Sequence, residues 1–500
     1  MTRATTFAAS LSTTLARWAR EVTYDDIPRD TIAAARSQLI SNLAAVRASL
    51  GHPAGRRIVA AFGPPAQSDP TRAAYVLAAL ATMLDFDEVA FAGHPSAGAV
   101  NVAVTEARRN GLDGRALLAT IVAATECASR ITAATILSVF FRGQTNMHTH
   151  LASAAVARLH ARGASLPEWT AGLGLALGTL AVPLHHGVVT SDLKALSAAA
   201  PVRMALDACD AARHGLSGPD TVLEHHEGLL AHLSEVPLPE VVTAGLGTRW
   251  HTNTLTYKRF PGSAYLHSAI DCAERLCRAH DRLDPDRVER VVVHANLLTW
   301  QLQRKVAGDL AGPRTTVSAA TLSVGYGIAT MLMNGAFGPV DLDPAGIADE
   351  RRWALADKVT VEHDWDLSLR MARATSPLGA ALRQAGERAL AWSDLLAWCG
   401  DDARGLLDGL GGPEETFDQA TMAIGARVVV ELADGRVLVE AADSAIGQAG
   451  PATRRDHPAI VREKFLATGG SAAVLTALEH VDELDPPATA AVLTEALAVR

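Results

Sequence analysis

Runs of alanine and leucine, each long enough for a helix, fill the first half of the chain and constrain the fold more than any other feature. Several runs, among them GRALLATIVAATECASRITAAT at residues 114–135, are apolar nearly all the way round. A helix of that kind lies in the interior and is packed by other elements on every side. Alanine is also the strongest helix former, and strand patterns are almost absent here. Residues 1–255 are therefore predicted to form a large all-helical domain.

Runs of β-branched residues appear only after about residue 255. The last run contains Asp434-Gly435, a dipeptide typical of a two-residue hairpin turn. Helical segments separate the runs, so residues 256–450 are predicted to form an α+β domain with a small sheet. Residues 451–500 are helical again and are expected to return to the first domain, which makes the fold mainly α with an α+β insertion. The three runs are RVERVVVHANLL (287–298), DKVTVEHDWDL (357–367) and ARVVVELADGRVLVEAA (426–442).

The bulk composition excludes several classes of partner. A formal net charge of −9, without any run of lysine or arginine, argues against nucleic acid, whose phosphates require a basic face. No uncharged apolar stretch combines membrane-spanning length with membrane-type flanks, so no membrane partner is expected. The five scattered cysteines form no CxxC pair, which favours a reduced, cytoplasmic protein over a disulfide framework.

Three motifs that suggest a cofactor or a metal do not meet the geometry that such sites require. AGLGLALG (171–178) has the wrong glycine spacing for a dinucleotide loop, and no strand precedes it. EHHEGLLAH (224–232) lacks two histidines four residues apart, as a zincin helix needs. MHTH spaces His148 and His150 like metal ligands on a strand, but no third ligand stands nearby. No cofactor and no metal are therefore expected.

Asp85, Asp87, Glu88 and His94 follow an apolar helix in the stretch LDFDEVAFAGHPSAG. Buried carboxylates are costly unless they are paired. A carboxylate that fixes an imidazole is a common acid–base arrangement, and histidine titrates near neutral pH, so Asp85 with His94 is a candidate pair. The alternative is a helix end with solvated acids and a loop histidine, and the spacing alone favours that alternative.

Other polar residues stand in apolar or glycine-rich surroundings. Lys194 opens the apolar helix SDLKALSAAAPVRMAL, where it either reaches solvent or faces a substrate carboxylate. Lys258 and Arg259 precede a Pro-Gly turn and a helix beginning at His267, a natural anion site whose alternative is a pair of surface cations. Tyr326 lies between two glycines, which allows close approach to a ligand, although core tyrosines are commoner. Together these groups suit a small polycarboxylate that loses an α-proton or a carboxylate.

These motifs also resemble the MmgE/PrpD family, which includes 2-methylcitrate dehydratase, cis-aconitate decarboxylase and iminodisuccinate epimerase. The resemblance implies a helical domain from both chain ends, an inserted α+β lid domain, a homodimer, and an active site between the domains. It further implies active-site positions for Asp85, His94, Lys194, Lys258 and Tyr326. The matching segments, in the family's order, are LDFDE…GHPSAGAV, DLKALSAAAPVRMAL, YKRFPGSAYLHSAID, TLSVGYGIATMLMNG, VVVELADGRVLVE and REKFLATGG.

The sequence departs from the family pattern at two places. Val89 stands closest to the position where the family usually has a threonine after the acids. The family's RGFHPT-like segment brings a further active-site histidine, whereas this chain has FFRGQTNMHTH, in which Arg142-Gly143 persists and no His-Pro follows. Arg142 or His148 is the candidate to replace that histidine, and the departure weakens the case for the standard family substrates.

The expected function is that of a cofactor-independent lyase acting on a small di- or tricarboxylate. His94, oriented by Asp85, is predicted to move the proton, and Tyr326 to donate to a carboxylate or hydroxyl. Dehydration of a 2-methylcitrate-like acid is the default. The alternatives are decarboxylation, epimerisation, an unrelated substrate for a repurposed family member, and a catalytically silent helical dimer. The groups predicted to hold the substrate are Lys194, Lys258, Arg142, His148, Arg259 and His267.

Overall fold

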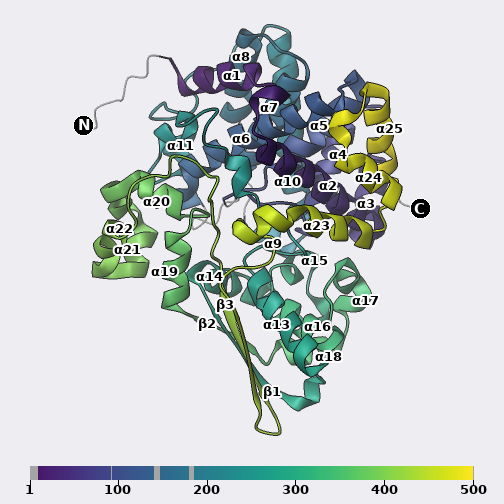
Figure 1. The fold of residues 1–500 in the computed structure, drawn as a ribbon, viewed down its shortest axis with the longest axis vertical. Helices are drawn as coiled ribbons and strands as arrows, with labels where there is room; N and C mark the ends of the chain where they lie inside the picture. Colours follow the sequence, from purple (N-terminus) through teal and green to yellow (C-terminus); the bar gives the residue numbers. More distant parts are fainter. Residues whose placement is uncertain (1–8, 92, 140–146, 180–184, 499–500) are drawn as a thin grey trace.

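The computed structural model describes residues 9–91, 93–139, 147–179 and 185–498, and helices make up most of this part of the chain (Figure 1). The prediction of a mainly α fold is confirmed. The helices before residue 250 are α1 (Leu11–Glu21), α2 (Arg29–Gly51), α3 (Pro53–Phe62), α4 (Pro70–Met83), α5 (Ser96–Asn110), α6 (Gly114–Val139), α7 (Met147–Ala161), α8 (Leu166–Gly178), α9 (His185–Thr190), α10 (Leu193–Arg213), α11 (Leu229–Leu233) and α12 (Pro239–Thr243).

The central helices of this part are α4, α5, α6, α7 and α10, which pack on one another. Helix α4 begins after Asp69, whose carboxylate accepts hydrogen bonds from two first-turn amides, and Pro70 occupies its first turn. Helix α5 ends at Gly111, which has the left-handed backbone common at helix ends. The alanine-rich sequence lets these helices approach closely, and their buried faces form the core.

Within the described residues, one stretch is long and apolar enough to span a membrane, at Gly114–Leu137 of α6. However, 94% of its most apolar window is buried inside the protein. The stretch is therefore a core helix, as its all-round apolar pattern predicts.

The second half contains a four-stranded sheet in the order β2-β1-β3-β4. Strands β1 and β2 are parallel and the other pairs are antiparallel, so the predicted β-branched runs and the hairpin at Asp434-Gly435 are confirmed. Helices α13 and α16 pack against the sheet. The elements are α13 (His267–His280), β1 (Val288–Ala295), α14 (Leu297–Val306), α15 (Val317–Ala320), α16 (Val324–Asn334), α17 (Pro344–Ile347), α18 (Glu350–Ala356), β2 (Val359–His363), α19 (Trp365–Arg373), α20 (Gly379–Ala385), α21 (Ser393–Cys399), α22 (Ala403–Asp408), β3 (Ala426–Leu432) and β4 (Val437–Ala442).

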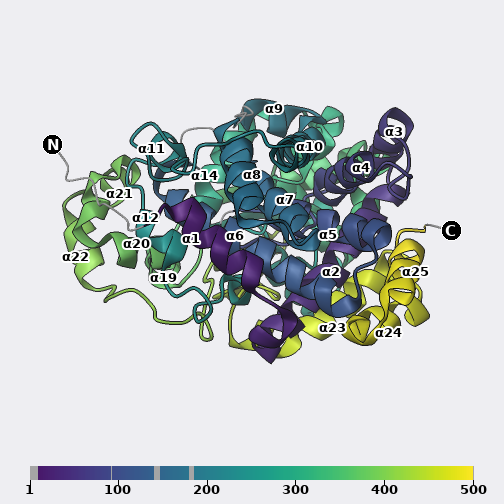
Figure 2. The ribbon, with the colours of Figure 1, turned by 90° about the horizontal axis from the view of Figure 1, so that it is seen from above.

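The C-terminal helices lie beside the N-terminal ones, as Figure 2 shows in yellow and purple. They are α23 (Pro451–Ala467), α24 (Ala472–Glu479) and α25 (Pro486–Ala496). Helix α23 packs on α2, and α25 packs on α5. Helices from both ends of the chain thus pack on one another, while the domain boundaries given above stay a prediction.

Candidate active site

The acidic loop, residues 84–91, follows α4 into the centre of the molecule. Its backbone is attached to the segment that leaves the helical part: Val89 and Thr256 exchange backbone hydrogen bonds of 3.3 and 2.9 Å, and the Gly262 amide donates to the Asp85 carbonyl at 3.1 Å. Asp85 has a left-handed backbone, with φ of 51°, which aspartate tolerates better than most residues. Contacts with both halves of the chain therefore set the position of the Asp85 side chain.

Two lysines hold the buried Asp85 carboxylate. Lys194 Nζ lies 3.1 Å from Oδ2, and Lys258 Nζ lies 2.5 Å from Oδ1. Lys258 also donates to the Asp85 carbonyl at 2.8 Å, and its side chain is fully buried. Burial by itself raises the pKa of Asp85, but Lys194, Lys258 and His94 more than offset it and bring that pKa well below its ordinary value. Asp85 is therefore an ionised link between two ammonium groups.

His94 is oriented by Asp87, which corrects the prediction that Asp85 does this. Nδ1 of His94 lies 3.0 Å from Asp87 Oδ2, whereas Nε2 lies 4.0 Å from Asp85 Oδ1. Burial raises the pKa of Asp87, but His94 and Lys258 together more than offset it, so the pKa lies below its ordinary value. An ionised carboxylate can only accept a hydrogen bond, so Nδ1 of His94 carries the proton toward Asp87, and Nε2 is the ring nitrogen left for proton transfer. Asp85 is instead engaged by the lysines.

His150 is a second imidazole at this site, and the sequence predictions did not include it among the site residues. Its ring centroid lies 6.4 Å from that of His94. Burial, reinforced by His94, lowers the pKa of His150 to about 3, so the ring is neutral at neutral pH. The signal was the MHTH motif, but on helix α7 two residues correspond to about 200° of rotation. His150 therefore faces the site, while His148 faces Thr135 at 3.0 Å.

These groups border a cavity of about 150 Å³. Its lining includes the two acids, three imidazoles (those of His94, His150 and His185), Lys194 and several apolar side chains. Helices from the first half and segments of the α+β part both contribute, so the cavity lies between them. The lining residues are Thr82, Asp85, Asp87, His94, Met147, His150, His185, Val188, Val189, Lys194, Ser197, Ala198, Ser263, Tyr265, Leu302 and Leu322.

Comparison with known families identifies both halves of this arrangement. Residues 13–241 match the MmgE/PrpD N-terminal domain, and residues 260–385 match the MmgE/PrpD C-terminal domain. The chain belongs to the MmgE/PrpD family. The comparison with curated proteins found no match. In this MmgE/PrpD protein the N-terminal match contains the acidic loop and Lys194, the C-terminal match supplies Ser263 and Leu302, and Lys258 lies just before the second match begins.

Tyr326 does not reach the cavity of this MmgE/PrpD protein, contrary to the prediction. Its hydroxyl donates to the Asp341 carbonyl and accepts a hydrogen bond from Arg352 Nη1 at 2.8 Å. The glycines beside it serve packing: a Cβ on Gly325 would lie 3.0 Å from a backbone oxygen, and one on Gly327 would lie 3.0 Å from Ile270. The small residues thus let α16 pack closely and do not open a path to a ligand.

The residues predicted to bind substrate are distributed differently. Arg259 is paired with Asp271 at 2.8 Å and with Glu274 at 3.1 Å, so its charge is neutralised outside the cavity. His267 is buried near Lys258, and burial together with Lys258 lowers its pKa to about 3. Neither Arg259, His267 nor His148 is among the residues that line the cavity. Arg142 lies outside the described residues.

Lys464 of α23 contacts the backbone and the Glu88 side chain of the acidic loop, a role that the sequence predictions missed. Its Nζ donates to Ser41 Oγ at 2.8 Å and to the Phe86 carbonyl at 2.5 Å, and it lies 3.6 Å from Glu88 Oε1. Burial lowers the pKa of Lys464 to about 8 and raises that of Glu88. The REKFLATGG segment was the only signal, and sequence reasoning gave it no role. The C-terminal helices therefore take part in building the site.

A metal ion fits this site poorly. Asp85, Asp87 and His94 offer ligand atoms within 4.8 Å of one another. However, the ammonium groups of Lys194 and Lys258 already occupy both carboxylate oxygens of Asp85. A cation would have to displace both lysines or bear their repulsion. The residues present suit proton transfer better than metal binding.

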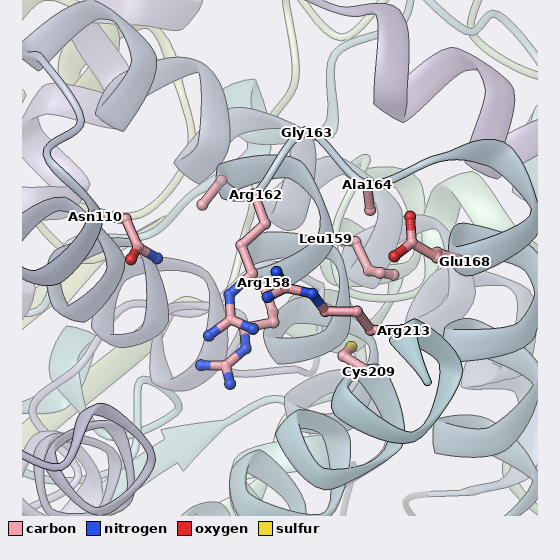
Figure 3. Close-up of a pocket in the computed structure, with 10 residues that line it drawn as sticks. Asn110, Arg158, Leu159, Arg162, Gly163, Ala164, Glu168, Cys209 and Arg213 are labelled. Atoms are coloured by element: carbon pink, nitrogen blue, oxygen red, sulfur yellow. The ribbon is translucent and has the colours of Figure 1, made fainter. Parts of the chain in front are cut away.

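A second cavity, of about 480 Å³, lies where α5, α7 and α10 end (Figure 3). Its Arg158 is paired with Glu106 at 2.7 Å and with Asp210 at 2.8 Å, and Arg162 is paired with the same two acids. The helix carbonyl ends add negative partial charge, which the arginines offset. None of the described residues that line this cavity is a histidine. The described lining of this second cavity therefore offers no imidazole for acid–base chemistry.

Proposed function

We propose that this MmgE/PrpD family member is a cofactor-independent lyase that removes water from a small carboxylic acid by acid–base catalysis. The observation that carries the proposal is the His94 imidazole, whose Nδ1 is held by Asp87 at 3.0 Å beside Lys194 in a cavity. A histidine whose Nδ1–H is held by a carboxylate can exchange a proton with a substrate through Nε2. Family membership supports lyase chemistry of this general kind.

In the proposed mechanism Lys194 binds the substrate carboxylate. Its ammonium uses one contact for Asp85, which leaves donors for a ligand. His94 Nε2 removes the proton from the carbon next to that carboxylate, and Lys194 stabilises the negative charge that develops on the carboxylate oxygens. The electron pair of the broken C–H bond forms the double bond as the C–O bond breaks. The departing hydroxide takes the proton from His94 and leaves as water, to which the proposal assigns a hydrogen bond from the His150 imidazole.

Decarboxylation is the second candidate, and one observation favours it. Burial brings the pKa of His150 to about 3, so that imidazole is a poor partner for proton exchange at neutral pH. A decarboxylase needs only one proton donor at carbon, and protonated His94 meets that need. Epimerisation needs two opposed groups that both exchange protons. It is least compatible with His150, because a ring with a pKa of about 3 exchanges protons poorly at neutral pH.

To test this proposal, the purified protein is incubated in D₂O with cis-aconitate, 2-methylcitrate, iminodisuccinate and a set of 3-hydroxy acids. Proton NMR follows both product and deuterium at the carbon next to the carboxylate. We expect turnover or exchange for at least one acid, and a loss of at least about 100-fold in His94→Gln. Neither turnover nor exchange on any of these acids, or an unchanged rate in His94→Gln, would overturn the proposal.

A further inference from the structure

We infer that the substrate carries a single carboxylate and an apolar substituent, rather than the two or three carboxylates that the family resemblance implies. This inference rests on the proposed function, because it concerns the substrate of the same cavity. Two independent features of the described residues support it: the balance of charge around the cavity and the apolar part of its lining.

The acids and lysines that the structure describes at the cavity carry balanced charges. Asp85 and Asp87 supply two negative charges, and Lys194 and Lys258 supply two positive ones. Lys258 is fully buried, and its ammonium is occupied by the carbonyl and the carboxylate of Asp85. Lys194, whose side chain is 11% exposed, is thus the lysine that lines the cavity among the described residues. One ammonium with spare donors matches one carboxylate.

Among the described residues that line the cavity, Lys194 is the one lysine or arginine, so a further carboxylate finds no second cation in this lining. Arg259, one of the two arginines predicted to help, is committed to Asp271 and Glu274. A tricarboxylate would bring three negative charges close to two buried carboxylates, and like charges in a poorly hydrated site repel strongly. Protonation of His94 would compensate for only one of them.

Part of the cavity lining is apolar. Val188 and Val189 of α9 and Leu302 of α14 form it together with Met147 and Leu322, and each of the five is less than 9% exposed. A carboxylate pressed against these side chains would lose its water without gaining a hydrogen bond. A branched alkyl or aryl group would instead gain from leaving water. The cavity of about 150 Å³ restricts that group to a few carbon atoms.

The test uses two acids of similar shape and different charge. Malate carries a carboxylate where 3-hydroxy-4-methylpentanoate carries an isopropyl group, and both have a hydroxyl β to another carboxylate. Isothermal titration calorimetry with the His94→Gln variant measures binding without turnover. We expect the isopropyl acid to bind about tenfold more tightly than malate, and citrate to bind more weakly still. Equal or tighter binding of malate or citrate would overturn the inference.

Substitutions in the apolar part of the lining provide the matched control. Leu302→Arg adds a cation to this part and should reverse the preference toward malate by about tenfold, whereas Leu302→Met should leave it unchanged. Should Leu302→Arg fail to fold, Leu322→Ala enlarges the cavity and should shift the preference toward 3-hydroxy-3-phenylpropanoate. A preference that neither substitution moves would show that this part of the lining does not contact the substrate.

The inference and the proposed function fail in different ways. Tight binding of the isopropyl acid without turnover or deuterium exchange in the wild-type protein would refute the lyase and leave the substrate class standing. Turnover of 2-methylcitrate or cis-aconitate, with no preference for the apolar acid, would support the lyase and refute the substrate class.

Discussion

Asp85 and Asp87 are two residues apart, yet the structure gives them different partners. The left-handed backbone of Asp85 turns its side chain toward Lys194 and Lys258, while Asp87 faces His94. Both carboxylates have pKa values below the ordinary value because positive neighbours outweigh the effect of burial. One acid therefore positions cations and the other positions an imidazole.

Removal of the charge of Asp87 should impair catalysis without unfolding the protein. Asp87→Asn keeps the shape of the side chain but lets the imidazole turn or take the wrong tautomer, and we expect kcat to fall by at least about 100-fold. Steady-state kinetics on the acid that the protein turns over gives the measurement. Asp220→Asn, an exposed acid in a loop, is the control and should retain the wild-type rate. A wild-type rate in Asp87→Asn would assign the orienting role elsewhere.

Asp85→Asn should instead destabilise the fold. It leaves the ammonium groups of Lys194 and Lys258 buried without their counter-charge, a loss typically worth about 3–5 kcal/mol. Urea unfolding of the variant, compared with wild type and Asp220→Asn, measures the change in the free energy of unfolding. A change below about 1 kcal/mol would mean that the two lysines find other partners.

Helix α23 is joined to the acidic loop by the Lys464 ammonium. That group donates to the Phe86 carbonyl and lies above the Phe86 ring at 4.1 Å, near Glu88. A helix from the last tenth of the chain thus fixes residues beside Asp85 and Asp87. The pairing is buried, so removal of one partner leaves the other charge without solvation.

A double-mutant cycle should reveal this coupling. Lys464→Met is expected to lower the free energy of unfolding by about 3 kcal/mol, and Lys464→Met with Glu88→Gln by less than the sum of the two single changes. Chemical denaturation of the four proteins measures it. Arg109→Met, at an exposed position of α5, should cost less than about 0.5 kcal/mol. Additive losses would show that Lys464 and Glu88 act independently.

At the scale of the whole molecule, several buried histidines make the fold sensitive to acid. Burial lowers the pKa of His148 and His251 to about 4 and that of His150 and His267 to about 3. In the unfolded chain each ring has an ordinary pKa near 6.5. The unfolded state therefore binds more protons below that pH, so the stability present above pH 6.5 is lost as the pH falls toward 4.

The free energy of unfolding should drop steeply between pH 7 and pH 5. Each of these histidines contributes a loss of roughly 2 kcal/mol at pH 5. His148→Gln, which keeps a polar group near Thr135, should reduce that drop by roughly 2 kcal/mol. Denaturant unfolding at a series of pH values measures both quantities. An identical pH dependence for wild type and His148→Gln would contradict the assignment.

Local pattern by itself determined much of this protein. Apolar runs identified the central helices, β-branched runs placed all four strands, and Asp434-Gly435 marked the hairpin, because period and turn chemistry are properties of neighbouring residues. The pattern of polar residues in apolar surroundings also marked Asp85, His94, Lys194 and Lys258 as candidate site residues.

Tertiary structure alone decided which of these groups meet. Lys194 and Lys258 are 109 and 173 residues from Asp85, and Lys464 is 378 residues from Phe86, so no local pattern records their contacts. The same packing brings Tyr326 into contact with Arg352 and places His150, rather than His148, in the cavity lining. It also pairs His94 with Asp87 rather than with Asp85. The sequence determines what each residue can do chemically, whereas helix packing and the left-handed backbone of Asp85 set the distances on which that chemistry depends.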